Sequence, residues 1–123
     1  MIQEEKELLL KDLCARLPYK PKCFTYTIRT DGKKENWTLK EVTTILINLF
    51  VANDFYGIVP YLRPMSSMTE EERVELKQVA IVDNEGIPGD IIAYIDWLNK
   101  HHIDYRGLIE KGLAIEAPEG MYS

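Results

Sequence analysis

The segment DWLNKHHIDYRGLIEKG, residues 96–112, holds the densest group of side chains that could do chemistry. Two adjacent histidines are followed closely by an aspartate, a tyrosine and an arginine. Histidine can act as a general base near neutral pH, and arginine can bind a carboxylate or phosphate through two parallel hydrogen bonds. One hypothesis is therefore a small enzyme, which requires two of these groups to converge in a concave pocket. Its candidate residues are His101, Asp104, Tyr105 and Arg106.

Helical geometry separates the two histidines. Residues 88–101 are predicted to form a helix, and its buried stripe consists of Ile91, Ile95 and Leu98. His102 falls on the side of this stripe, whereas His101 falls on the adjoining flank. The two rings are not expected to bind one metal ion, and neither HxxxH nor HExxH spacing occurs. The sequence predicts no metal and no cofactor.

The residues after the histidines fit the two ends of a short helix over 104–111. Asp104 suits the N-cap, where its carboxylate accepts hydrogen bonds from free backbone N–H groups. Gly112 can adopt the left-handed conformation that ends a helix, with Leu113 packing back on Leu108. Most polar residues of the segment thus have a structural role that needs no ligand.

Arg106 remains as a candidate binding residue, with Tyr105 and His101 as its neighbours. For Arg106, an internal salt bridge or a contact with a partner is favoured over a substrate clamp. For the two histidines, structural roles are favoured, because catalysis needs a base held in place by a second group.

The elements that must position these residues begin with a helix over 3–17. Leu9, Leu13 and Leu17 recur every four residues and form one apolar stripe. Glutamates lie in the first turn, where the helix dipole favours them. Pro18 then ends the helix, because proline restricts the residue before it.

A β-hairpin is predicted next, with strands over 22–30 and 33–39. Phe24, Tyr26 and Ile28 alternate with smaller residues at the period of a strand. The Asp31-Gly32 dipeptide favours the positive φ angles of a tight turn.

Residues 38–52, TLKEVTTILINLFVA, fit two structures. Thr38 and Glu41 could form a capping box at the start of a helix with one apolar stripe. The run is also rich in β-branched residues, and alternate positions fill one face of a strand. We predict a strand over 43–51, because a hairpin needs a third strand to be stable.

Further helices are predicted over 69–79 and 88–101, the first opened by a Thr69–Glu72 capping box. Pro60 and Pro64 keep the preceding connection extended. The expected fold is α+β, with an N-terminal helix on a small, mostly antiparallel sheet and three helices covering it. Residues 1–117 form one domain, and 118–123 form a loose tail.

Composition points to a soluble cytoplasmic protein. The chain of 123 residues is 46% hydrophobic and can bury one core. Its start is acidic, unlike a secretory signal, and its longest apolar run is too short to span a membrane. Cys14 and Cys23 match neither a CxxC pair nor a zinc knuckle and are interpreted as structural.

The net charge of −5 is unevenly distributed. Residues 1–40 carry nine Lys and Arg against six Asp and Glu, whereas residues 41–123 carry six against fourteen. The basic hairpin, with its aromatic residues, could bind nucleic acid by stacking and charge. The candidate residues of this face are Lys22, Arg29, Lys33, Lys34 and Trp37. The competing interpretation is that the aromatics face the core and the lysines protect an edge strand from aggregation.

Three segments of the chain carry a resemblance to known sequences: KELLLKDLCARLPY (6–19), PYLRPMSSMTEEE (60–72) and DWLNKHHIDYRGLIEKGLAIEAPEGMY (96–122). They resemble a family of short, uncharacterised proteins from gut Bacteroidales bacteria and their phages or mobile elements. The family has no assigned activity, so the resemblance implies no catalytic residue. It implies a small cytosolic accessory protein linked to a phage or prophage.

The favoured hypothesis is a non-catalytic interaction module with a protein partner and no membrane contact. It predicts an exposed apolar or aromatic patch. Nucleic-acid binding through residues 20–40 is the alternative, and the small enzyme is the third hypothesis.

Overall fold

A computed structural model describes residues 1–122 and has the predicted α+β fold. The helices are α1 (Gln3–Arg16), α2 (Thr44–Ala52), α3 (Glu70–Val79) and α4 (Ile91–Lys100), with 3-10 turns η1 (Leu17–Tyr19) and η2 (Met65–Ser67). The strands are β1 (Lys22–Ile28), β2 (Lys34–Glu41), β3 (Tyr56–Pro64), β4 (Ile103–Asp104) and β5 (Ile115–Glu116).

The sheet is mixed, with β1 at the centre of its antiparallel part. The strand order is β2-β1-β3-β4, and β5 also pairs with β3. β1 is antiparallel to both neighbours, whereas β4 and β5 run parallel to β3. The predicted hairpin is therefore confirmed, and Gly32 has the positive φ of +86° that its turn requires.

The strand predicted over 43–51 is wrong, because these residues form α2. Thr43, whose side chain accepts a hydrogen bond from the Leu46 N–H, is its N-cap. Leu46, Ile47 and Phe50 are buried, which is helical spacing, whereas Ile45 is 72% exposed. The capping residue is thus not Thr38, which lies in β2.

The third strand is β3, in the stretch predicted to be an extended connection. Pro60 lies opposite Cys23 in the ladder with β1, and on the other edge β5 pairs only with Tyr61 and Leu62. Proline is unusual in a central strand, because it has no N–H to donate to a neighbouring strand. The sequence predicted only an extended connection here, and the position of β3 within the sheet depends on its tertiary neighbours.

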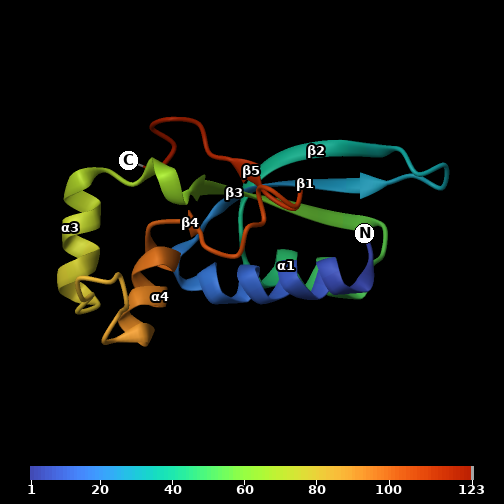
Figure 1. Cartoon of the computed structure of the whole chain (residues 1–123). Helices are drawn as coiled ribbons and strands as arrows, with labels where there is room; N and C mark the ends of the chain where they lie inside the picture. The colour runs from blue at the N-terminus through green and yellow to red at the C-terminus, as the bar shows by residue number, and fades with distance from the viewer. Residues whose placement is uncertain (123) are drawn as a thin grey trace.

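The first two helices cover one face of the sheet and form the main core with it. In Figure 1, α1 lies on one side of the strands, and no helix lies on the other side within residues 1–122. Leu9 and Leu13 of α1, which were predicted to face the core, are fully buried. The core also contains Leu46, Phe50, Ile58, Leu62 and Leu108. The other face of the sheet is therefore not covered by a described helix, and we call it the open face.

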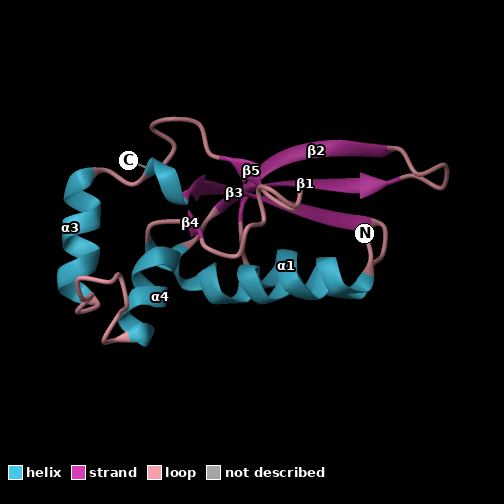
Figure 2. Cartoon of the chain, in the orientation of Figure 1, coloured by secondary structure: helices cyan, strands magenta, loops and turns pink. Residues whose placement is uncertain are grey.

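The other two helices pack on each other at the end of the sheet (Figure 2). They share a second, smaller core around Leu76, Trp97 and Leu98. The Thr69–Glu72 capping box of α3 is present as predicted. Helix α4 begins at Ile91 after the N-cap Asp90, rather than at Pro88. Ile91, predicted to be buried, is 57% exposed, because the buried side of α4 is formed by Trp97 and Leu98.

The helix predicted over 104–111 is absent, although its cap and its stop exist. The Asp104 carboxylate accepts hydrogen bonds from the N–H groups of Leu108 and Ile109. Gly112 is left-handed, and the Leu113 N–H donates to the Leu108 carbonyl. Gly107, with φ of +73°, interrupts the helical conformation between them. The segment is therefore a capped series of turns.

Tyr122 lies in the segment that was predicted to be a loose tail. Its hydroxyl accepts a hydrogen bond from the Lys22 N–H and donates to the Tyr61 carbonyl, each at 2.8 Å. Its ring stacks on His102 with centroids 3.8 Å apart. These contacts fasten the end of the described chain to β1 and β3. None of the helices in residues 1–122 has the length and apolar character needed to cross a membrane.

Candidate functional site

Arg106 belongs to a buried cluster of charges between α1 and the 103–106 segment. Its Nε lies 3.6 Å from Oδ1 of Asp12, and its guanidinium lies over the Tyr105 ring. Arg16 binds the other oxygen of Asp12 at 2.9 Å and donates to the Ile103 carbonyl at 2.7 Å. Burial raises the pKa of Asp12 against the opposing effect of Arg16. Arg106 therefore makes an internal ion pair.

Tyr105 is held by the same cluster and by α4. Its ring lies near both the Arg16 and the Arg106 guanidinium groups, at 5.2 and 4.8 Å from its centroid. Its hydroxyl donates to Oδ1 of Asn99 at 2.8 Å. The predicted neighbours Tyr105 and Arg106 thus do contact each other, in a packed interior region.

The two histidines lie against different elements. His101 stacks on Trp97 and places its Nδ1 3.7 Å from a carboxylate oxygen of Glu72. His102 is buried against Tyr122, and burial together with nearby cations lowers its pKa to about 4. Burial also lowers the pKa of His101, against the effect of Glu72. His102 is therefore neutral near pH 7.

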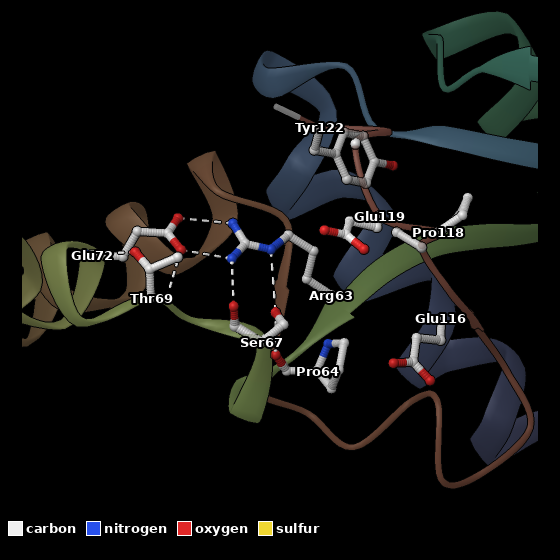
Figure 3. A pocket seen from close by; sticks show the side chains of 11 residues that line it. Arg63, Pro64, Ser67, Thr69, Glu72, Glu116, Pro118, Glu119 and Tyr122 are labelled. Atoms are coloured by element: carbon white, nitrogen blue, oxygen red, sulfur yellow. Dashed lines mark hydrogen bonds and ion pairs between the residues drawn. The ribbon is translucent and has the colours of Figure 1, made fainter.

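The residues proposed for an enzyme do not converge on a cavity. Arg106 is paired with Asp12, Asp104 caps a turn, and His101 lies beside Glu72. None of them lines the cavity shown in Figure 3. The geometric requirement of the enzyme hypothesis is therefore not met by this group.

The cavity of Figure 3 lies between β3, the start of α3 and the C-terminal segment, with a volume of about 580 Å³. Arg63 projects from the end of β3 and makes two hydrogen bonds to the Glu72 carboxylate, at 2.7 and 2.8 Å. It also donates to the Ser67 hydroxyl and carbonyl. The bond to Arg63 lowers the pKa of Glu72 to about 2. This pair joins β3 to α3.

The charge of the cavity wall is unfavourable for an anionic ligand. Glu116 and Glu119 add two carboxylates to the Arg63–Glu72 pair. Burial raises the pKa of Tyr122, which also lines the cavity, to about 12. Within residues 1–122, no three His, Cys, Asp or Glu side chains gather in a group that could hold a metal ion. The cavity favours a cationic occupant over a phosphate or carboxylate.

The open face of the sheet carries a row of aromatic rings from three strands. Opposite residues of an antiparallel ladder project to the same face, so Phe24 shares a face with Leu39 of β2 and Val59 of β3. The Phe24 ring centroid lies 6.2 Å from that of Trp37 and 5.5 Å from that of Tyr61. We call this surface the aromatic face and define it by Phe24, Tyr26, Trp37, Leu39 and Tyr61.

The outer part of the aromatic face is exposed, and its inner part is packed. Trp37 is 49% exposed and Leu39 is 54% exposed, whereas Tyr26 is 4% exposed. The Tyr26 ring occupies the space that a side chain at Gly57 would need, so glycine is required there. A bulge in β2 places two residues, Asn36 and Trp37, opposite Tyr26. The bulge thus sets Trp37 against the Tyr26 ring, at a centroid distance of 4.7 Å.

The basic residues predicted for a nucleic-acid face differ in whether they form ion pairs with acidic side chains. Lys34 lies over the Tyr26 ring at 4.8 Å, and neither it nor Lys33 forms an ion pair with any described residue. Arg29 is paired with Asp31 at 2.6 Å and with Glu35 at 3.7 Å. Lys22 is exposed at the start of β1. Arg29 therefore supplies little free positive charge, and the lysines supply most of it.

Several residues of these surfaces were not found from the sequence. Arg63 and Glu72 come from different elements, and only the capping role of Glu72 could be predicted locally. Tyr61 was not found because its segment was interpreted as an extended connection rather than as a strand. Its alternation with Val59 was the signal that could have revealed it.

No protein-family model, curated protein or solved structure matches this chain.

Proposed function

We propose that the protein is a non-catalytic accessory protein of the cytoplasm that binds a macromolecular partner through the aromatic face. The observation that carries the proposal is the exposure of Trp37 and Leu39 on a sheet face that no described helix covers. Large apolar side chains that are exposed together are typical of interaction surfaces. Tryptophan is also among the residues that contribute most to binding energy at such surfaces.

The aromatic face is also rigid, which favours binding. Phe24 and Tyr61 are half-buried and contact each other, so their rings are held before a partner arrives. Lys34 is held over Tyr26. A preformed surface loses less conformational entropy on binding than a flexible one.

Two further observations agree with an accessory role. The chain contains cysteine thiols rather than a disulfide, Cys23 being buried and Cys14 exposed, as is common in reducing compartments. The resemblance of three segments to short Bacteroidales and phage proteins supports a role connected with a phage or prophage.

The test compares which partners are recovered from cells with the wild type, with a variant of the aromatic face and with a control variant of another exposed apolar surface. Tagged protein is expressed in cells of the native host, and the recovered proteins and nucleic acids are quantified. Trp37→Ala/Leu39→Ala removes exposed apolar side chains from the aromatic face. Ile91→Ala/Ile92→Ala removes two others from α4 that are also exposed, at 57% and 80%.

We expect a partner that is recovered with the wild type and the α4 variant and is depleted about tenfold or more with the aromatic-face variant. Circular dichroism and thermal unfolding establish that each variant is folded. Equal recovery with both variants, or recovery of the bare protein alone in every case, contradicts the proposal.

A further inference from the structure

We infer that the partner bound by the aromatic face is single-stranded nucleic acid. The inference rests on the function proposed above and names the chemical class of its ligand. Proteins that bind single strands without strong sequence preference combine aromatic stacking surfaces with a positively charged track for the backbone. The aromatic face has both components.

The stacking surface is the row Tyr61–Phe24–Trp37, which crosses β3, β1 and β2. Neighbouring centroids in the row are 5.5 and 6.2 Å apart. Trp37 has the most exposed ring of the three and stands at the edge strand. Bases of a flexible single strand can be turned out to lie on such rings, whereas the bases of a duplex are already stacked on each other.

The positive charge is concentrated in the hairpin that carries these rings. Residues 20–41 contain six Lys and Arg against three Asp and Glu, whereas the rest of the chain contains nine against seventeen. Lys33 and Lys34 make no ion pair with a described residue, and Lys34 lies on the aromatic face itself. A local positive field on an acidic protein directs a polyanion to this surface and away from the others.

The surroundings of the aromatic face agree with this choice of ligand. A second cavity, of about 350 Å³, opens beside Tyr26 and Lys34. Its wall carries Lys6 and Lys111 as well as Glu5 and Asp54, so three lysines there face two carboxylates. The cavity at the other end of β3 carries Glu116 and Glu119 and disfavours phosphate. A negative charge, Glu41, lies opposite Lys22 at one end of the face. We therefore place the nucleic-acid strand over the part of the aromatic face formed by β1 and β2, near Lys34 and Trp37.

The experiment uses the full chain and fluorescently labelled oligonucleotides, oligo-dT and oligo-U, with a duplex of equal length for comparison. Anisotropy titrations at low and moderate salt give the affinity and its salt dependence. Quenching of tryptophan emission reports contact at Trp37, because the other tryptophan, Trp97, is buried against His101. Trp97→Phe isolates the signal of Trp37.

We expect saturable binding of single strands, weaker binding of the duplex, and quenching of Trp37. Trp37→Ala should weaken binding by about tenfold, whereas Trp37→Phe, which keeps a ring, should weaken it less. Lys34→Glu should weaken binding. It should also make the plot of log association constant against log salt concentration less steep, by about 0.7 for each phosphate that the variant no longer neutralises. The matched charge control, Lys77→Glu on α3, should change both quantities much less.

Three results would overturn the inference. They are the absence of binding at low salt, equal effects of Lys34→Glu and Lys77→Glu, and a preference for duplex over single strands. The failure of the inference is distinguishable from that of the proposed function. If oligonucleotides do not bind but the Trp37→Ala/Leu39→Ala variant still loses a host protein, the aromatic face is an interaction surface whose partner is a protein.

Discussion

At the scale of single residues, His102 is an ionisable group enclosed by the fold. Its φ of +61° is left-handed, its carbonyl accepts a hydrogen bond from Arg63 N–H, and its ring lies on Tyr122. Its Nδ1 is buried without a hydrogen-bond partner among the described residues. Protonation would place a charge in this buried position, near the cationic Arg16 and Arg63. The folded state therefore favours neutral imidazole.

This arrangement predicts a pH dependence of stability. Because the pKa of His102 is about 4 when folded and 6.5 ordinarily, the unfolded chain binds its proton more readily. The contribution of neutral His102 to the free energy of unfolding is complete above about pH 6.5. It is lost as the pH falls toward 4, and this loss amounts to about 2–3 kcal/mol. His102→Asn, which tolerates the left-handed conformation, should remove this part of the pH dependence in urea unfolding.

The control is His101→Gln, which removes the neighbouring histidine. Burial lowers the pKa of His101 too, so this variant should reduce the slope modestly. If wild type and His102→Asn lose stability equally between pH 6.5 and 4, His102 is not the group responsible.

At the scale of elements, α2 shows how position in the fold chooses between helix and strand. Residues 43–51 fit both an alternating and a helical pattern. The helix places Leu46, Ile47 and Phe50 together against the core, whereas a strand would have buried Ile45, Leu49 and Val51. Because β3 supplies the third strand beside the hairpin, residues 43–51 are not needed in the sheet. As a helix, they bury their apolar stripe against the core.

The N-cap of α2 gives a direct test of this assignment. Thr43→Ala removes the hydroxyl that accepts from the Leu46 N–H at 3.3 Å, and should lower the free energy of unfolding by about 1 kcal/mol. Thr44→Ala, at the first helical position, should be neutral or slightly stabilising, since alanine has the higher helix propensity. Urea unfolding of both variants measures the difference. Equal effects would argue against the cap.

At the scale of the whole molecule, buried charges connect the first helix to the C-terminal third. Asp12 and Arg16 are fully buried, and Arg16 reaches the Ile103 carbonyl. Arg106 lies near the other oxygen of the same carboxylate, at 3.6 Å. A buried ion pair adds little net stability, but removal of one partner leaves an uncompensated charge.

Asp12→Ala should therefore lower the free energy of unfolding by about 3–5 kcal/mol. Asp12→Leu/Arg16→Met, which removes both charges and keeps apolar volume, should be substantially more stable than the single variant. Asp54→Ala is the control, because Asp54 forms an exposed ion pair with Lys6 and should change stability by less than about 1 kcal/mol. Chemical denaturation of the three variants provides the comparison. A double variant as unstable as Asp12→Ala would contradict this account.

Sequence periodicity and capping were sufficient for α1, the hairpin, α3 and most of α4. In each case the deciding contacts lie within a few residues, such as the Thr69–Glu72 box or the Asp31-Gly32 turn. The candidate surface was predicted in part: Trp37 and Lys34 were named, whereas Tyr61 was not. Arg29 was named as well, but its pairing with Asp31 and Glu35 became visible only in three dimensions.

The sequence by itself determined the α+β class, the basic aromatic hairpin and the acidic remainder of the chain, because these follow from local patterns and composition. Tertiary structure decided three further features: the helical state of α2, the strand at β3 and the open side of the sheet. Each depends on which long-range neighbours cover a segment. Apolar residues at helical spacing or at strand spacing stabilise an element mainly when they pack against another part of the protein. The side of the hairpin that stays uncovered is likewise set by where α1 and α2 pack.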